Sequence, residues 1–167
     1  MKYAVVYLSD TGNTKKIAEE IFLALPEGSK TIADLSKDDF PYADFYFIGF
    51  PVKYNYCSAL ITDILECLND KELAFFSTCG LSPTDNYKKM IFKNIKPWIN
   101  ESCTVRGYFL CQGKSAESYK ESLKDNDAVV KAAFERMVSE GDTHPDDRDF
   151  DSAFSFAESI TRGHKNE

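Results

Sequence analysis

A short run of hydroxyl-bearing residues around one glycine is the part of this sequence best suited to chemistry. It follows an apolar segment, precedes a helical pattern, and reads Ser9-Asp10-Thr11-Gly12-Asn13-Thr14. Open backbone N–H groups at a helix N-terminus attract a phosphate, and a glycine lets the chain approach the anion closely. The hydroxyls add hydrogen bonds without fixed charge. The run therefore predicts a phosphate site, with a plain helix cap and turn as the alternative.

Alternating apolar segments and helical patterns place this run at the end of a strand. Continuous β-branched and aromatic segments of this kind form strands that are buried on both faces of a parallel sheet. Strands are expected at 2–8, 30–33 (the weakest), 44–50, 72–78 and 104–111, and helices at 14–25, 58–68, 82–96, within 115–140 and at 150–160. Ser58 is expected to cap the second helix, while Ser82 and Pro83 begin the third. The alternation predicts an α/β fold with a doubly wound open sheet.

Other phosphate-binding folds find no support in the sequence. It contains no G-x-x-x-x-G-K-[ST] motif, and no G-x-G-x-x-G follows a strand. A receiver domain needs an acidic residue after the third strand, where Gly49-Phe50-Pro51 stands. Neither Cys79 nor Cys111 begins the C-x5-R loop of a tyrosine phosphatase. Folds that bind ATP or a dinucleotide are disfavoured for the same reasons.

The S-x-T-G-x-T pattern after the first strand resembles the FMN phosphate loop of flavodoxins, and the strand pattern extends the resemblance through about residues 1–113. The resemblance implies a flavodoxin-like five-stranded parallel sheet of order 2-1-3-4-5, with helices on both faces. It implies FMN as a non-covalent cofactor at the carboxyl edge of the sheet. The phosphate would be held by Ser9, Asp10, Thr11, Gly12, Asn13 and Thr14. Asp10 occupies a variable position and is expected to point outward.

By the same resemblance, the loops after the third and fourth strands clasp the flavin ring. The expected contacts are Pro51, Val52, Tyr54, Asn55 and Tyr56 in the first loop, and Thr78, Cys79, Gly80 and Tyr87 in the second. Tyrosines can stack on a flat ring, although plain packing is an equal alternative for each. The first loop lacks the glycine that flavodoxins commonly carry there. Asn55 tolerates left-handed backbone and is the candidate for that place.

Composition narrows the partners and the compartment. A net charge of −7 repels nucleic acid and favours redox proteins with basic docking surfaces, though acidity can also serve solubility alone. No apolar stretch is long enough to cross a membrane. The cysteines are odd in number and contain no C-x-x-C pair, which suits a reducing cytoplasm. Cys57, Cys79 and Cys111 are expected to be buried fillers rather than redox thiols.

The chain is interpreted as a single domain, residues 1–167, with an added helical segment at about 114–148. His144-Pro145-Asp146-Asp147 is expected to cap the last helix, and neither histidine has metal-ligand spacing. The ending resembles a subgroup of flavodoxin-like proteins from anaerobic bacteria.

The leading function is an electron carrier that shuttles electrons between redox partners through FMN. The alternative is an FMN-dependent reductase of quinones or other small molecules, suggested by the missing glycine and the long tail. A module that has lost FMN is the third reading, and the intact phosphate loop disfavours it.

Overall fold

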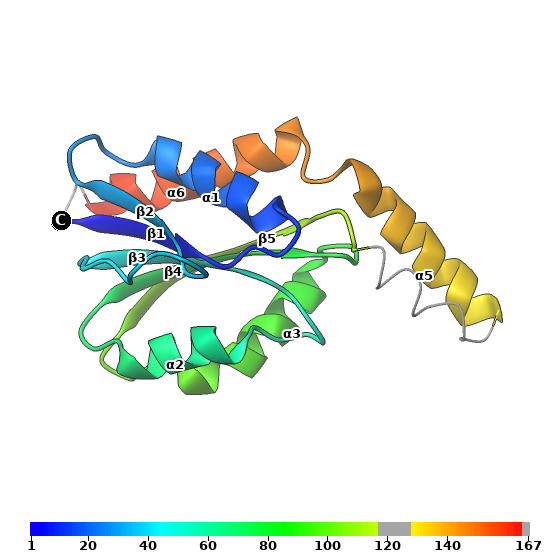
Figure 1. The fold of residues 1–167 in the computed structure, drawn as a ribbon, viewed down its shortest axis with the longest axis horizontal. Coiled ribbons are helices and arrows are strands. Elements are labelled where there is room, and N and C mark those ends of the chain that lie inside the picture. The colour runs from blue at the N-terminus through cyan, green and yellow to red at the C-terminus, as the bar shows by residue number, and fades with distance from the viewer. Residues whose placement is uncertain (117–127, 165–167) are drawn as a thin grey trace.

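The computed structural model describes residues 1–116 and 128–164, in which strands and helices alternate (Figure 1). The strands are β1 (Tyr3–Tyr7), β2 (Lys30–Asp34), β3 (Phe45–Pro51), β4 (Glu72–Cys79) and β5 (Thr104–Gln112). The helices are α1 (Asn13–Ala24), α2 (Ala59–Cys67), α3 (Asp85–Ile95), α5 (Ala128–Glu140) and α6 (Asp147–His164), with 3-10 turns η1 (Lys96–Trp98) and η3 (Gly141–Thr143). All five expected strands are present, including the weak one at β2.

The strands form one parallel sheet in the order β2-β1-β3-β4-β5, which confirms the doubly wound topology. Every residue of β1 is buried, and its side chains divide between two core layers. Ala4 and Val6 pack in the layer under α2 and α3, whereas Tyr3, Val5 and Tyr7 pack in the layer under α1 and α6. Because helices cover both faces, the strands read as unbroken apolar runs instead of alternating ones.

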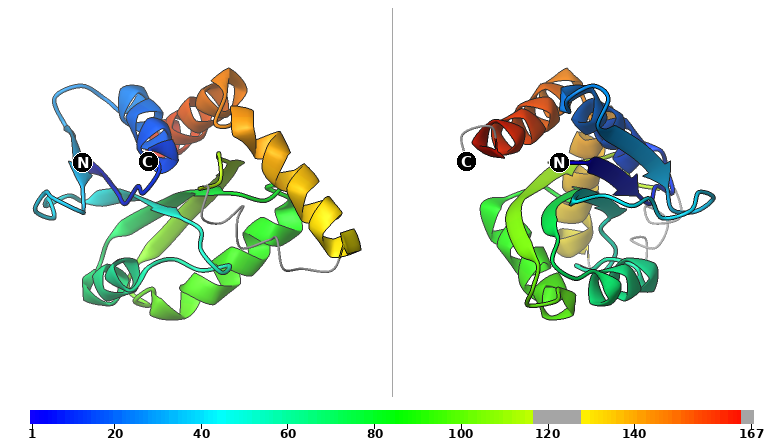
Figure 2. Two further views of the ribbon diagram at one scale, coloured as in Figure 1. Left: turned by 45° about the vertical axis from the view of Figure 1, so that its right-hand side comes forward. Right: turned by 90° about the vertical axis from the view of Figure 1, so that its left-hand side faces the viewer.

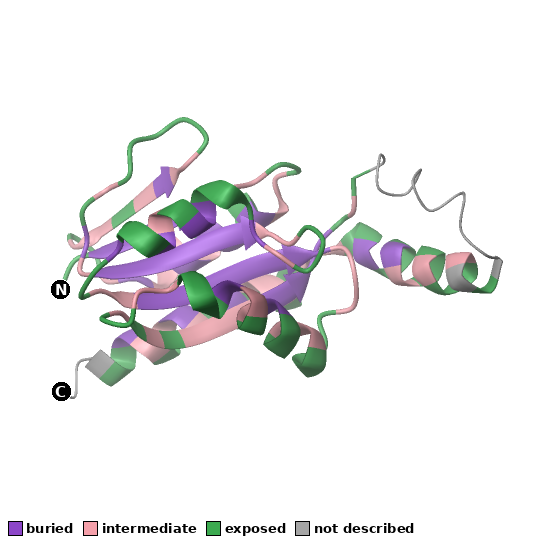
Figure 3. Cartoon of the chain, turned by 90° about the horizontal axis from the view of Figure 1, so that it is seen from below, coloured by how far each residue is buried: buried purple, intermediate pink, exposed green. Residues whose placement is uncertain are grey.

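Each helix buries one stripe of side chains against the sheet. Ile17 and Ile21 of α1 are fully buried, as are Ile61 and Leu65 of α2. Figure 3 shows the result: the central strands β1, β3 and β4 are buried, the edge strands β2 and β5 are partly exposed, and the outward sides of the helices are exposed. The buried residues of each helix are four positions apart, which is the amphipathic pattern that predicts a helix in the sequence.

The loops that follow the parallel strands gather at one edge of the sheet. The loops after β1, β3, β4 and β5 lie at this carboxyl edge, which is where open α/β sheets bind ligands. The 3-10 turn η3 and helix α5 lie beyond the same edge, and α5 projects away from the body of the molecule (Figure 2). The added segment is therefore rooted beside the expected cofactor site.

The start of α3 differs from the sequence expectation. Ser82 and Pro83 were expected as its cap and first residue, but the helix begins at Asp85 with Thr84 as the N-cap. The Thr84 hydroxyl accepts a hydrogen bond from the Tyr87 amide at 3.2 Å. Ser82 instead accepts the Thr84 amide through its carbonyl, in a tight turn that includes Pro83. Two cap-forming residues compete here, and the second one ends the turn and begins the helix.

The later part of the chain agrees with the expected helices where it is described. Helix α5 corresponds to the helical stretch expected within 115–140, and α6 contains the expected helix at 150–160. Residues 117–127 of the added segment lie outside the described residues. Among the described residues, none of the helices has the length and apolar character that a membrane span requires.

Candidate functional site

The loop between β1 and α1 has the backbone geometry of an anion cradle. Gly12 is the N-cap of α1 and has a left-handed φ of 88°. Ser9 Oγ accepts a hydrogen bond from the Lys15 amide at 3.2 Å, so the hydroxyl at the start of the loop folds back onto the first helical turn. A Cβ at Gly12 would meet no atom within 4 Å, so the space above this backbone is open. The amides of a first helical turn lack intrahelical acceptors, and a phosphate fits this donor set.

The remaining loop side chains join the cradle to neighbouring strand ends. Thr14 is buried, and its hydroxyl lies 2.9 Å from the hydroxyl of Thr78 at the end of β4. Asn13 donates from Nδ2 to Thr11 Oγ1 at 3.0 Å and to the Lys114 carbonyl at 2.9 Å. The structure thus brings three expected residues, Thr11, Thr14 and Thr78, to one place at the carboxyl edge.

The loop after β3 is a tight hairpin rather than an open clasp. Lys53 and Tyr56 exchange two backbone hydrogen bonds, at 3.0 and 2.9 Å. The two residues between them, Tyr54 and Asn55, have φ values of 52° and 61°. Positive φ at both central positions is the requirement of a type I′ turn. The left-handed backbone expected for Asn55 is confirmed, and Tyr54 shares it. The Tyr54 side chain is 99 % exposed, so it is free to cover a ligand.

Contacts with other elements fix this hairpin in place. Asn94 of α3 donates from Nδ2 to the Asn55 carbonyl at 3.0 Å. Burial raises the pKa of Tyr56, and the nearby Trp98 side chain in η1 offsets part of this rise. On the opposite side, Lys53 Nζ lies 2.5 Å from Asp10 Oδ2 in the phosphate loop. The hairpin is therefore pinned between α3 and the phosphate loop. Asp10 is half-exposed, consistent with the outward position expected for it.

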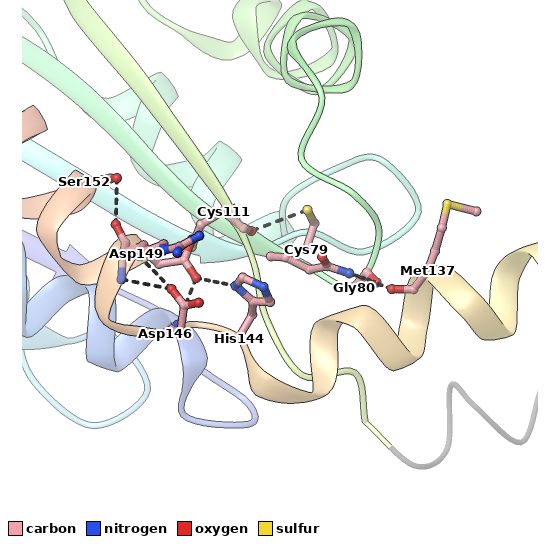
Figure 4. A network of polar contacts seen from close by, with 10 residues as sticks. Cys79, Gly80, Cys111, Met137, His144, Asp146, Asp149 and Ser152 are labelled. Atoms are coloured by element: carbon pink, nitrogen blue, oxygen red, sulfur yellow. Dashed lines mark hydrogen bonds and ion pairs between the residues drawn. The ribbon is translucent and has the colours of Figure 1, made fainter.

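The loop after β4 is tied to the root of the added segment. Gln112, buried at the end of β5, donates from Nε2 to the Gly80 carbonyl at 3.3 Å and to the Met137 carbonyl at 2.7 Å (Figure 4). A Cβ at Gly80 would lie 2.3 Å from Ser115 Oγ, so any larger residue at this position would require the Ser115 hydroxyl to move. Tyr87, the expected aromatic cover, is partly buried and packs against the core.

The three cysteines near this edge are buried, as expected. Cys79 is 4 % exposed and its thiol donates to the Leu81 carbonyl at 3.1 Å, so the side chain turns inward. Burial raises the pKa of Cys57 to about 11 and that of Cys79 to about 12, and it also raises the pKa of Cys111. Because the thiolate is the reactive form, these thiols are unreactive at neutral pH, which supports a packing role.

A histidine and two carboxylates cluster at the start of α6. His144 Nδ1 lies 2.5 Å from Asp149 Oδ2, which also accepts the Asp146 amide at 2.9 Å (Figure 4). Asp146 Oδ1 in turn accepts the amides of Arg148 and Asp149, at 3.0 and 3.2 Å. This reciprocal pattern is a capping arrangement, and it confirms the cap expected from residues 144–147. The possible ligand atoms of these three residues lie within 4.8 Å of one another, and the cap accounts for their closeness.

A cavity of about 410 Å³ opens between the phosphate loop and the added segment. Thr11, Asn13 and Lys16 line one side, and Lys114 and His144 line the other. Of the described residues, those at 51–57 and 78–87 do not line it. The cavity therefore adjoins the phosphate cradle on the side away from the hairpin.

Three residues of this edge were not expected from the sequence: Lys53, Asn94 and Gln112. Gln112 had a local signal, since a polar side chain follows the apolar run of residues 108–111 at the end of the strand. Lys53 is the only charged residue in the loop of residues 50–57, which was a weaker signal. Asn94 lies within a helix and had none.

Comparisons with known proteins agree with this architecture. The flavodoxin domain model matches residues 4–158. The flavodoxin-like domain-containing protein BilS of Clostridioides difficile (strain CD3) is 34 % identical over 172 residues, covering 96 % of each chain. The protein of the same name from Clostridium symbiosum (strain WAL-14163) is 28 % identical and covers 89 % of this chain and 90 % of its own.

A solved structure shows the same fold at low sequence identity. Oxidised flavodoxin 2 from Bacillus cereus superimposes with a TM-score of 0.60 at 14 % identity, over 98 % of this chain and 99 % of that one. The family match and the geometry of the β1–α1 loop together support FMN as the cofactor. With the flavodoxin domain spanning most of the sequence and a close relative aligned along nearly its whole length, this chain belongs to the flavodoxin-like family.

Proposed function

We propose that this protein is an electron carrier that binds FMN at the carboxyl edge of its sheet and exchanges electrons with redox proteins. The observation that supports it most is the convergence of three segments at that edge: the phosphate loop, the Lys53–Tyr56 hairpin and the loop after β4. Bound FMN would supply the electron chemistry, and the chain would supply binding and orientation.

Each segment has a distinct part in this proposal. The amides and hydroxyls of residues 9–14 bind the phosphate. Tyr54, exposed at the tip of a pinned hairpin, covers one side of the flavin ring. Gly80 at the end of β4 would contact the ring through its backbone, because Ser115 Oγ takes the place that its side chain would occupy. The contacts of Pro51, Val52, Asn55, Tyr56, Thr78, Cys79 and Tyr87 with the ring are proposed on the same basis.

The surface charge supports protein partners for this carrier. A net charge of −7 on 167 residues favours encounter with basic docking surfaces. The described cysteines are all free thiols, which suits a cytoplasmic location. We treat the whole chain as one domain, to which the segment 114–148 is an addition.

An FMN-dependent reductase is the second candidate, and the cavity beside the phosphate loop is the observation in its favour. Its volume of about 410 Å³ is within the range of small-molecule sites, and Lys16 and Lys114 would favour an anionic substrate. The carrier remains the first choice, since the cavity adjoins the phosphate side and the flavin-ring loops do not line it.

An FMN titration tests the cofactor, and a turnover assay separates the two functions. We expect tight, fluorescence-quenched FMN binding by the wild type, and weaker binding by Thr11→Ala, which loses one hydroxyl of the cradle. Absence of binding by the wild type would refute the proposal. Rapid NAD(P)H oxidation with a quinone acceptor would favour the reductase, whereas electron exchange only with a reduced or oxidised protein partner would favour the carrier.

A further inference from the structure

Lys53 is a cation that contacts the phosphate loop directly. Its Nζ lies 2.5 Å from Oδ2 of Asp10, which stands two residues before Gly12 in the loop. The two side chains are 65 % and 53 % exposed, so water weakens their pairing. An ion pair of this kind can be exchanged for a stronger one.

The hairpin backbone places Lys53 beside the rim of the loop. Lys53 is the first residue of the type I′ hairpin, whose register is set by its two backbone bonds to Tyr56. The Val52 amide donates to the Thr78 carbonyl at 2.9 Å, and Asn94 secures the far end of the hairpin. The fold therefore fixes the backbone position of Lys53, and its flexible side chain can reach either Asp10 or a phosphate in the loop.

Charge favours exchange of partners when a phosphate occupies the loop. The other donors in residues 9–14 are neutral, and the Asp10 carboxylate would repel the phosphate. A phosphate monoester carries about −1.5 to −2 charges near pH 7, against −1 for a carboxylate. The ammonium of Lys53 is thus attracted more strongly to the phosphate than to Asp10.

We propose that Lys53 is a phosphate-recognition residue that leaves Asp10 and pairs with the phosphate of bound FMN. This inference rests on the proposed FMN function and adds a charged contact to a loop that otherwise binds through neutral groups. Asp10 holds the ammonium in place before the cofactor arrives. Lys53 then contributes to the preference for FMN over riboflavin, which lacks the phosphate.

The test compares FMN and riboflavin affinities, measured by quenching of flavin fluorescence. The ratio of the two dissociation constants isolates what the phosphate contributes. We expect Lys53→Gln to lower this preference for FMN by about tenfold, a value at the low end for charged hydrogen bonds because the site is exposed. Lys53→Arg keeps the charge and should retain most of the preference.

Lys15→Gln is the matched control for the loss of one positive charge. Lys15 lies in the first turn of α1, but its ammonium is directed to Glu19, 3.8 Å away. We expect less than a twofold change in the preference for FMN. An unchanged preference in Lys53→Gln, or an equal fall in Lys15→Gln, would overturn the assignment.

A double-mutant cycle separates contact with the phosphate from simple neutralisation of Asp10. In an Asp10→Asn background the carboxylate charge is absent, so Lys53→Gln should still lower the preference about tenfold if the ammonium contacts the phosphate. No effect in that background would refute the contact. Failure of the wild type to bind FMN at all would instead refute the proposed function, so the two failures are distinct.

Discussion

Replacing Gly12 by alanine should separate the binding role of the phosphate loop from its structural role. At φ 88° an L-residue is strained by about 1–2 kcal/mol. The added Cβ meets no protein atom within 4 Å, so strain is the whole cost to folding. For a chain of this size, about 1–2 kcal/mol lowers the melting temperature by about 2–8 °C.

The effect on FMN should exceed the effect on stability. The Cβ would project into the open space where the phosphate approaches the backbone. Loss of one charge-assisted hydrogen bond costs about 1.5–3 kcal/mol, so we expect FMN affinity to fall by about 10- to 100-fold. Fluorescence titration measures the affinity, and thermal melts of the apoprotein measure the stability.

Gly28→Ala supplies a matched control for this experiment. Gly28 has a φ of 78° and its Cβ would also meet nothing within 4 Å, so the strain is alike. It lies beyond the other end of α1, about 18 Å along the helix from the phosphate loop. Both variants should lose similar stability, and only Gly12→Ala should lose affinity. Equal FMN affinity in Gly12→Ala and the wild type would refute the reasoning.

Three further perturbations test other parts of the site. Thr14→Val should lower the free energy of unfolding by about 1–3 kcal/mol in urea titrations, because the buried Thr78 hydroxyl loses its partner. Thr14→Ser retains the hydroxyl and should keep most of the wild-type stability. Tyr54→Gly should raise the free energy of unfolding by up to about 1 kcal/mol, because glycine adopts a φ of 52° without strain and the lost side chain is fully exposed. The same variant should bind FMN more weakly. A less stable variant would contradict the hairpin geometry. Burial raises the pKa of Cys57 to about 11 and that of Cys79 to about 12, so these folded thiols keep their protons above the ordinary value near 9.0. Their stabilising effect is complete below pH 9 and is lost as pH rises through 11 to 12. The free energy of unfolding should therefore fall progressively from pH 8 to pH 10 and pH 11. The fall should be smaller in Cys57→Ala, which has one of these thiols fewer.

Local patterns were sufficient to predict the sheet and the phosphate loop. The central strands are buried on both faces, so they are marked by apolar runs such as residues 44–50. The loop of residues 9–14 combines a glycine, hydroxyls and a helix start within a few positions, so its chemistry is visible without a fold. The left-handed state of Asn55 could also be inferred from residue type.

The contacts that hold the flavin loops could not be read in the same way. Lys53 contacts Asp10, and Asn94 contacts Asn55, although the partners in each pair lie about 40 residues apart in the sequence. The start of α3 depended on which of two capping residues ends a turn, and residue preference slightly favours Ser82 over Thr84, the N-cap in the structure. Long-range partners and close choices between similar residues therefore required the structure.

The double hydrogen bond of Gln112 has a consequence for anyone who shortens this protein. Its amide nitrogen donates both to the Gly80 carbonyl and to the Met137 carbonyl in α5, and a Cβ at Gly141 would come within 2.9 Å of this nitrogen. A truncation that removes the projecting helix would thus leave a solvent-facing amide beneath the loop after β4. Through Gln112, α5 and the loop after β4 share one hydrogen-bond donor. A shortened version of the protein should therefore also replace the residue at position 112.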